Sequence, residues 1–152
     1  MKSYAKLVLM AAFAVLFLST LAAADTPGVH PAYLHALSNL RAARAYLSLE
    51  TANYNLNANE TYAIQAIDAA IQVIKEAAID DGKPLSDHPP VDVNLGRLDR
   101  LNRARVLLEQ TEVELNQRES DAYVNGLKHR ALSHINDAWK NTKRAINPTW
   151  HE

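Results

Sequence analysis

Between Ile64 and Ala78 the apolar residues recur every three or four positions, and this pattern constrains the fold more than any other feature of the chain. Side chains at that spacing lie on one face of an α-helix. The stripe consists of Ile64, Ile67, Ile71, Ile74 and Ala78. Because such a face has to be buried against other elements, the pattern predicts an amphipathic helix within a packed helical domain.

The same spacing continues over most of the chain after residue 30, and no useful length alternates with a period of two. Pro31 suits the first position of a helix. Asn57 and Glu60 form a capping box, Ser120 or Asp121 caps a later helix, and Gly82 suits the left-handed turn after a helix. The sequence therefore predicts an all-α fold with helices at about 31–51, 58–81, 94–118 and 121–146. With one apolar stripe each, these helices predict an up-down-up-down antiparallel four-helix bundle.

The first 24 residues read as a secretory signal peptide. Lys2 and Lys6 precede a run of about a dozen apolar residues. After this run, Ala22 and Ala24 form an A-x-A cleavage site. The run is shorter than a membrane-spanning helix requires. We therefore expect cleavage after Ala24, export to the periplasm or the medium, and a mature single domain of residues 25–152 with no transmembrane segment.

Composition excludes several kinds of chemistry. The chain has no cysteine, and both methionines lie in the leader, so thiolate zinc sites, iron–sulfur clusters, cysteine nucleophiles and methionine-ligated metals are ruled out. Removal of the leader leaves 14 Lys and Arg against 17 Asp and Glu, so the formal charge falls from −1 to −3. An acidic chain is a poor partner for nucleic acid. Four scattered glycines and no hydrolase or di-iron motif argue against an enzyme, and we predict no catalytic residues and no organic cofactor.

Histidines and aspartates gather at one end of the predicted bundle. An up-down-up-down arrangement would place the start of the first helix, the end of the second and the start of the third together. The residues that would meet there are His30, His35, Asp80, Asp81, Asp87, His88 and Asp92. Imidazole and carboxylate groups bind first-row metals, so one interpretation is a zinc-type site that uses His30, His35, Asp80, Asp81 and His88.

A structural clasp explains the same residues without a ligand. His30 would cap the first helix, His35 would close the bundle end, and the aspartates would hold the proline-rich segment 83–93. Asp80 and Asp81 lie at the C-terminus of the second predicted helix, where the helix dipole disfavours negative charge, so a compensating cation is expected. That cation is a metal, His35, His88 or Lys83.

Three further features have both a functional and a structural interpretation. His134 lies on an inward stripe and would either serve a haem, pair with Asp137 in catalysis, or be satisfied within the core. Trp150 either packs against the same end of the bundle as His30 or is an exposed residue that contacts a partner. The remaining feature is a set of six arginines: Arg41, Arg44, Arg97, Arg100, Arg103 and Arg105. They would either hold an anionic partner or form a solvated, salt-bridged face, and we favour the salt-bridged face.

Four stretches, "HPAYLHALSNLRAAR", "AAIDDGK", "DHPPVDV" and "HRALSHINDA", resemble a group of small exported helical proteins from soil bacteria. The resemblance spans about Val29 to Ala138 and implies a bacterial envelope protein. It carries over no activity, cofactor or functional residue. We therefore expect an exported, non-enzymatic binding or envelope-associated module whose partner is an envelope component, with a periplasmic metal-binding protein as the alternative.

Overall fold

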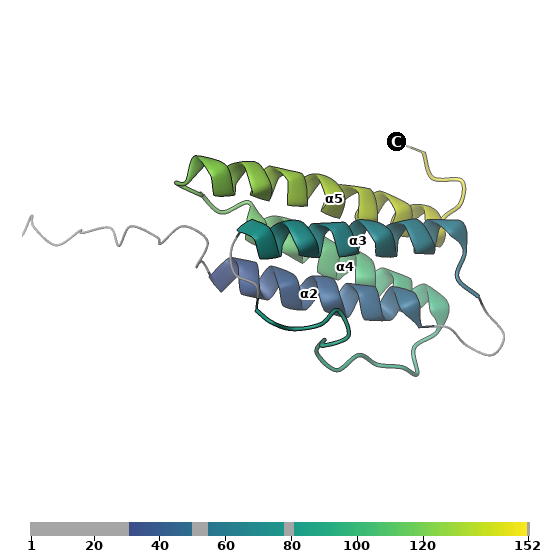
Figure 1. The fold of residues 1–152 in the computed structure, drawn as a ribbon. Helices are drawn as coiled ribbons and strands as arrows, with labels where there is room; N and C mark the ends of the chain where they lie inside the picture. The colour runs from purple at the N-terminus through teal and green to yellow at the C-terminus, as the bar shows by residue number, and fades with distance from the viewer. Residues whose placement is uncertain (1–30, 50–54, 78–80, 152) are drawn as a thin grey trace, which may run out of the picture.

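Four α-helices make up most of the described chain. The computed structural model describes residues 31–49, 55–77 and 81–151. The helices lie side by side and are α2 (Pro31–Ser48), α3 (Ala58–Ala77), α4 (Arg97–Leu115) and α5 (Ala122–Ile146) (Figure 1). The predicted all-α four-helix bundle is confirmed. The predicted signal peptide lies outside the described residues.

The predicted helix starts are confirmed where short polar residues cap them. The side chain of Asn57 accepts a hydrogen bond from the backbone of Glu60, and the Glu60 carboxylate accepts one from the backbone of Asn57, both at 2.9 Å. Asp121 caps α5 by accepting from the backbone of Val124 at 2.9 Å. Gly82 has a φ of 67°, in the left-handed region that its sequence context predicts.

Three helices are shorter than predicted. The helix α4 begins at Arg97 rather than at residue 94, because residues 93–95 form a turn and Gly96 is extended, with φ −61° and ψ 159°. It ends at Leu115 rather than 118. The helix α2 ends at Ser48 instead of 51. Asp81 was predicted as the last residue of the second helix and lies outside α3; residues 78–80 are not among the described residues.

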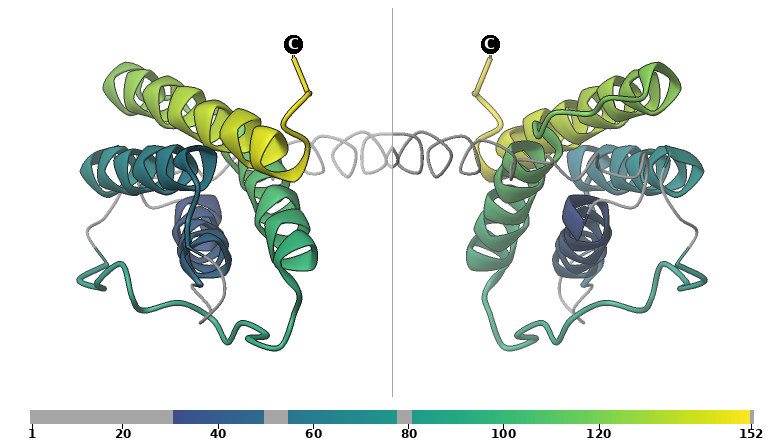
Figure 2. Two further views of the ribbon diagram at one scale, coloured as in Figure 1. Left: turned by 90° about the vertical axis from the view of Figure 1, so that its right-hand side faces the viewer. Right: turned by 90° about the vertical axis from the view of Figure 1, so that its left-hand side faces the viewer.

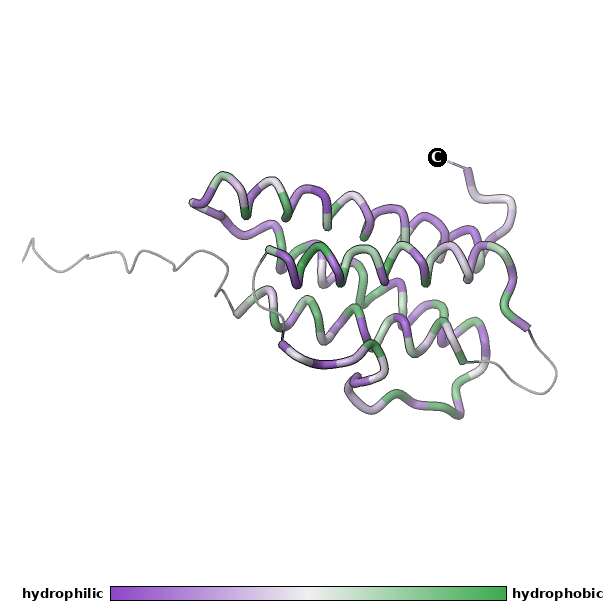
Figure 3. The backbone as a smooth tube through the Cα atoms, viewed as in Figure 1, coloured by the Kyte–Doolittle hydropathy of each residue, from purple (hydrophilic) through white to green (hydrophobic). Residues whose placement is uncertain are grey.

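The core is made of leucine, isoleucine and alanine. Hydrophilic and hydrophobic residues are mixed along every helix (Figure 3), and the buried apolar residues of each helix recur at helical spacing. The helices α3 and α5 pack against each other most extensively. Each has a row of buried alanines seven residues apart, which are Ala63, Ala70 and Ala77 in α3 and Ala131, Ala138 and Ala145 in α5. Small side chains on both helices permit this close packing. None of the described helices is long and apolar enough to cross a membrane.

Seen along the bundle, α3 and α4 lie on opposite sides, with α2 below and α5 above (Figure 2). The helix α2 packs against α3 and α4, and α5 packs against the same two helices, so α2 lies diagonally opposite α5. Consecutive helices α3 and α4 are therefore diagonal rather than adjacent. The chain connects them through a long irregular stretch whose described part, residues 81–96, we call the crossover segment.

The direction of α4 differs from the prediction. Arg100, in the first turn of α4, donates a hydrogen bond to the carbonyl of Leu49 just after α2. Arg97 contacts Glu60, in the first turn of α3, at 3.2 Å. The helices α3 and α4 thus begin at the same end of the bundle, and the four directions are up, down, down, up. The prediction of up-down-up-down is wrong because the crossover segment returns along the length of α2 before α4 begins.

Candidate functional site

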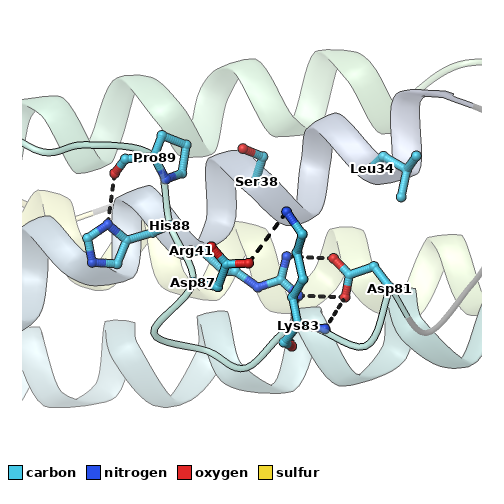
Figure 4. A pocket seen from close by; sticks show the side chains of 8 residues that line it. All are labelled: Leu34, Ser38, Arg41, Asp81, Lys83, Asp87, His88 and Pro89. Carbon is cyan, nitrogen blue, oxygen red and sulfur yellow. Dashed lines mark hydrogen bonds and ion pairs between the residues drawn. The ribbon is translucent and has the colours of Figure 1, made fainter.

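The crossover segment and α2 enclose a pocket of about 410 Å³. The wall from α2 consists of Leu34, Ser38 and Arg41, and the wall from the crossover segment consists of Asp81, Lys83, Asp87, His88 and Pro89 (Figure 4). We call this cavity the clasped pocket, because an ion pair fastens its two walls together.

That ion pair joins Arg41 to Asp81. Both terminal nitrogens of the guanidinium donate to the two carboxylate oxygens at 2.8 Å, which is a bidentate geometry. Arg41 also donates to the carbonyl of Lys83 at 3.2 Å. The side chains of Arg41 and Asp81 are only 2% and 11% exposed, so water screens their interaction weakly. The start of the crossover segment is therefore fixed to the middle of α2.

Asp81 is surrounded by groups that favour its ionised form. It accepts a hydrogen bond from the backbone of Lys83 at 3.2 Å, and the ammonium of Lys75 lies 3.7 Å away. The hydrogen bonds from Arg41 lower the pKa of Asp81 most, and the Lys83 backbone and both cations add to them. Partial burial opposes the shift, and the resulting pKa is about 2. Asp81 is thus anionic at any ordinary pH.

Arg41 has one donor that is not used within the described residues. Its Nε is buried and makes no hydrogen bond to any of them. An unpaired N–H costs free energy unless water or a ligand supplies an acceptor. The guanidinium that fastens the pocket wall therefore retains some capacity to donate.

The mouth of the clasped pocket has a second, looser ion pair. The ammonium of Lys83 lies 3.4 Å from the Asp87 carboxylate, and the two side chains are 57% and 47% exposed. Beside them, Nδ1 of His88 contacts the carbonyl of Pro89 at 2.8 Å. A carbonyl only accepts hydrogen bonds, so Nδ1 is the donor in this contact. Charged groups of both signs thus flank the opening.

A neighbouring hollow extends the site across α2. Leu34 and Ser38 line it as well as the clasped pocket, and His35, Asn39 and Glu114 complete it. The side chain of Asn39 donates to Glu114 at 3.2 Å, which joins α2 to α4 at its edge. Leu34, which is 48% exposed, stands between the two cavities.

The structure brings together part of the predicted histidine and aspartate set. Asp81, Asp87 and His88 line the clasped pocket, while the exposed His35 lies in the neighbouring hollow. His30 and Asp80 lie outside the described residues. Among the described residues, no three histidine or acidic side chains form a group that could hold a metal.

Asp92 was expected at the same end and is not there. Its backbone donates to the hydroxyl of Tyr46 at 3.3 Å, towards the other end of α2. The reason is the reversed direction of α4, because the crossover segment carries Asp92 away from the start of α2.

The cation that compensates Asp81 was also predicted incorrectly. Its partners are Arg41 and Lys75, whereas Lys83 pairs through its ammonium with Asp87. A signal for Arg41 does exist in the sequence. It lies four residues after Leu37 and six before Leu47, inside the apolar stripe of α2, where a charged side chain needs a buried partner.

Most of the predicted arginine set serves as ties within the bundle. Arg44 pairs with Asp68 at 2.6 Å, and Arg105 pairs with Glu109 at 2.5 Å. Arg97 and Arg100 hold the ends of helices, as described above. The interpretation as salt-bridged residues is confirmed for Arg44, Arg97 and Arg105. Arg41 and Arg100 are buried instead, and Arg100 donates to backbone carbonyls.

Trp150 packs on the bundle, at the end of α5. Its ring meets that of Trp139 edge to face, with 5.7 Å between centroids, and the ammonium of Lys143 lies 4.9 Å from both centroids. This is the end of the bundle opposite the start of α2 (Figure 1), so the prediction that Trp150 packs at the end where the first helix begins is wrong. The aromatic pair therefore lies far from the clasped pocket.

Comparison of the chain with protein families, with curated proteins and with solved structures finds no match. The geometry of the clasped pocket is therefore the main guide to function.

Proposed function

We propose that this protein is an exported, non-enzymatic helical bundle that binds a small polar ligand in the clasped pocket. The observation that carries the proposal is a cavity of about 410 Å³ whose walls are joined by a buried, bidentate ion pair. Ligand sites are typically preformed cavities with a few polar groups at fixed positions. The Arg41–Asp81 pair fixes the walls, and Ser38, Lys83 and Asp87 supply the polar groups.

The state of the acidic groups supports binding rather than catalysis. Asp81, with a pKa of about 2 and its oxygens occupied by donors, is a very weak base. Asp87 is half-exposed and paired with Lys83. A general base works best when its pKa is near the operating pH and its oxygens can reach a substrate proton. Asp81 does not have these properties.

A pocket-filling substitution tests the proposal. The mature chain from Asp25, made without a histidine tag, is screened against a library of small polar fragments by ligand-observed NMR. Ser38→Phe fills the pocket from α2, and Ser133→Phe places the same ring on an exposed position of α5 as the control. We expect hits that bind the wild type and Ser133→Phe and are lost in Ser38→Phe. Hits that bind all three proteins equally, or no hits at all, would refute the pocket as the binding site.

Metal binding is the alternative function. A titration with zinc alone, followed by calorimetry, tests it in the mature chain, which includes His30 and Asp80. Stoichiometric zinc binding that is lost in both His35→Ala and His88→Ala would replace the small-ligand proposal with a metal-binding function. Ligands that bind only the native state also raise the melting temperature, which provides a second readout.

A further inference from the structure

The charged groups that line the clasped pocket are balanced in sign. Arg41 and Lys83 supply two positive charges, and Asp81 and Asp87 supply two negative charges. Lys75 contacts Asp81 from α3 and is not among the lining residues. A ligand with a net charge would pair with one charged side chain of the pocket and leave another without a partner. A ligand with one positive and one negative group could pair with both signs.

The two ion pairs differ in how easily a ligand can replace them. The Arg41–Asp81 pair is buried and bidentate, so breaking it is costly. The Lys83–Asp87 pair is about half-exposed, and pairs of that kind contribute little to stability. Lys83 and Asp87 can therefore exchange their contact with each other for contacts with neighbouring groups on a ligand, without moving far apart.

The spacing of the outer pair restricts the ligand further. The Lys83 ammonium and the Asp87 carboxylate are 3.4 Å apart, so the groups that pair with them must also be close together. An α-amino acid satisfies this condition, since one carbon atom separates its ammonium from its carboxylate. A peptide does not, because its two termini are separated by the chain.

The remaining walls suit an apolar side chain. Leu34 is 48% exposed at one end of the pocket, and Pro89 lies at the other end, with Ser38 between them (Figure 4). Burial of an aliphatic group between them would remove apolar surface from water.

We propose that the ligand of the clasped pocket is a free α-amino acid with an aliphatic side chain, held by Lys83 through its carboxylate and by Asp87 through its ammonium. This inference rests on the proposed function. It assigns the outer ion pair to ligand recognition and the inner pair to holding the walls.

Three probes with related carbon skeletons test the class of ligand. They are L-leucine, 4-methylpentanoate, which lacks the ammonium group, and 3-methylbutylamine, which lacks the carboxylate. Calorimetric titration of the mature chain should give an affinity for leucine at least about tenfold higher than for either analogue. Equal affinity for leucine and one analogue would overturn the proposal, as would the absence of leucine binding.

Charge-removing variants locate the recognition. Lys83→Gln and Asp87→Asn should each reduce leucine affinity to the level of the analogue that lacks the corresponding partner group. Arg130→Gln and Glu76→Gln are matched controls, because these two side chains form a pair at 3.5 Å with 58% and 52% exposure outside the pocket. Leucine binding that is unchanged in Lys83→Gln and Asp87→Asn would contradict the proposal.

The outcomes separate this inference from the proposed function. One outcome is that fragments bind, that Ser38→Phe abolishes their binding, and that leucine does not bind. In that case the pocket is a ligand site, and only the proposed class of ligand is wrong. If neither fragments nor leucine bind the wild type, both proposals fail.

Discussion

At the scale of single residues, Arg41 has the greatest structural consequence. It is buried in the apolar face of α2, where its guanidinium needs a counter-charge. Asp81 provides its counter-charge and at the same time fixes the start of the crossover segment. Removing either side chain would leave a buried charge without its partner.

Replacement of Arg41 by methionine should lower the free energy of unfolding by about 3 kcal/mol, because the carboxylate of Asp81 loses its bidentate partner. Urea unfolding followed by circular dichroism measures the change. Arg103→Met, at an exposed position of α4, is the control and should change stability by less than about 0.5 kcal/mol. A loss of similar size in both variants would show that Arg41 has no special role.

Acid should weaken the same ion pair. The pKa of Asp81 is about 2 in the folded protein and 3.8 when unperturbed, so the unfolded chain binds the proton more readily. The stabilisation that Asp81 contributes is therefore present above about pH 4 and disappears as the pH falls towards 2. Melting temperatures measured between pH 5 and pH 2 should fall more steeply for the wild type than for Asp81→Asn. Parallel curves would contradict this assignment.

At the scale of elements, helix ends are set by short polar residues close in sequence. The reciprocal hydrogen bonds between Asn57 and Glu60 satisfy two backbone donors at the start of α3. Glu60 is buried and also contacts Arg97 of α4, so this cap connects two helices. A local motif thus contributes to tertiary packing.

Loss of the cap should be measurable. Asn57→Ala should reduce stability by about 1 kcal/mol, since one backbone donor of α3 loses its acceptor. Asn136→Ala removes an asparagine from an exposed interior position of α5, where alanine is the better helix former, and should be neutral or slightly stabilising. Thermal unfolding of the two variants compares them directly, and an equal loss would argue against the cap.

Sequence reasoning succeeded for features that depend on nearby residues. The capping box, the Asp121 cap and the left-handed Gly82 were all predicted from two to four neighbouring positions. The start of α4 was not, because nothing in the sequence excludes residues 94–96 from the helix, whereas the structure has a turn at 93–95 and an extended Gly96. Pairing of Arg41 with Asp81 joins residues 40 positions apart, and apolar spacing carries no information about such a contact.

At the scale of the whole molecule, the crossover segment determines both the topology and the pocket. Because this segment runs back along α2, α4 starts at the same end of the bundle as α3. The segment itself becomes one wall of the clasped pocket. Helical periodicity identifies inward faces but not the direction of each helix. A proline-containing connection of this length permits either direction, so the topology could not be predicted from the apolar pattern.

Distances between spin labels should distinguish the two topologies. The chain has no cysteine, so cysteine pairs can be introduced without background. Labels at Thr61 and Leu98 should be much closer than labels at Gln72 and Leu98, because Thr61 and Gln72 are separated by about 16 Å along α3. Pulsed electron paramagnetic resonance measures both distances. An up-down-up-down bundle would give the opposite order.

The central claim is that the crossover segment is fastened against α2 and so forms a binding pocket. The most direct test is paramagnetic broadening of amide NMR signals by a nitroxide at position 35, introduced as His35→Cys on the exposed face of α2. We predict strong broadening of the amides between Lys83 and His88 and little at Thr149 and Trp150, at the opposite end of the bundle. Amides between Lys83 and His88 that stay as sharp as those of Thr149 and Trp150 would show that the segment does not lie on α2, and the clasped pocket would not exist.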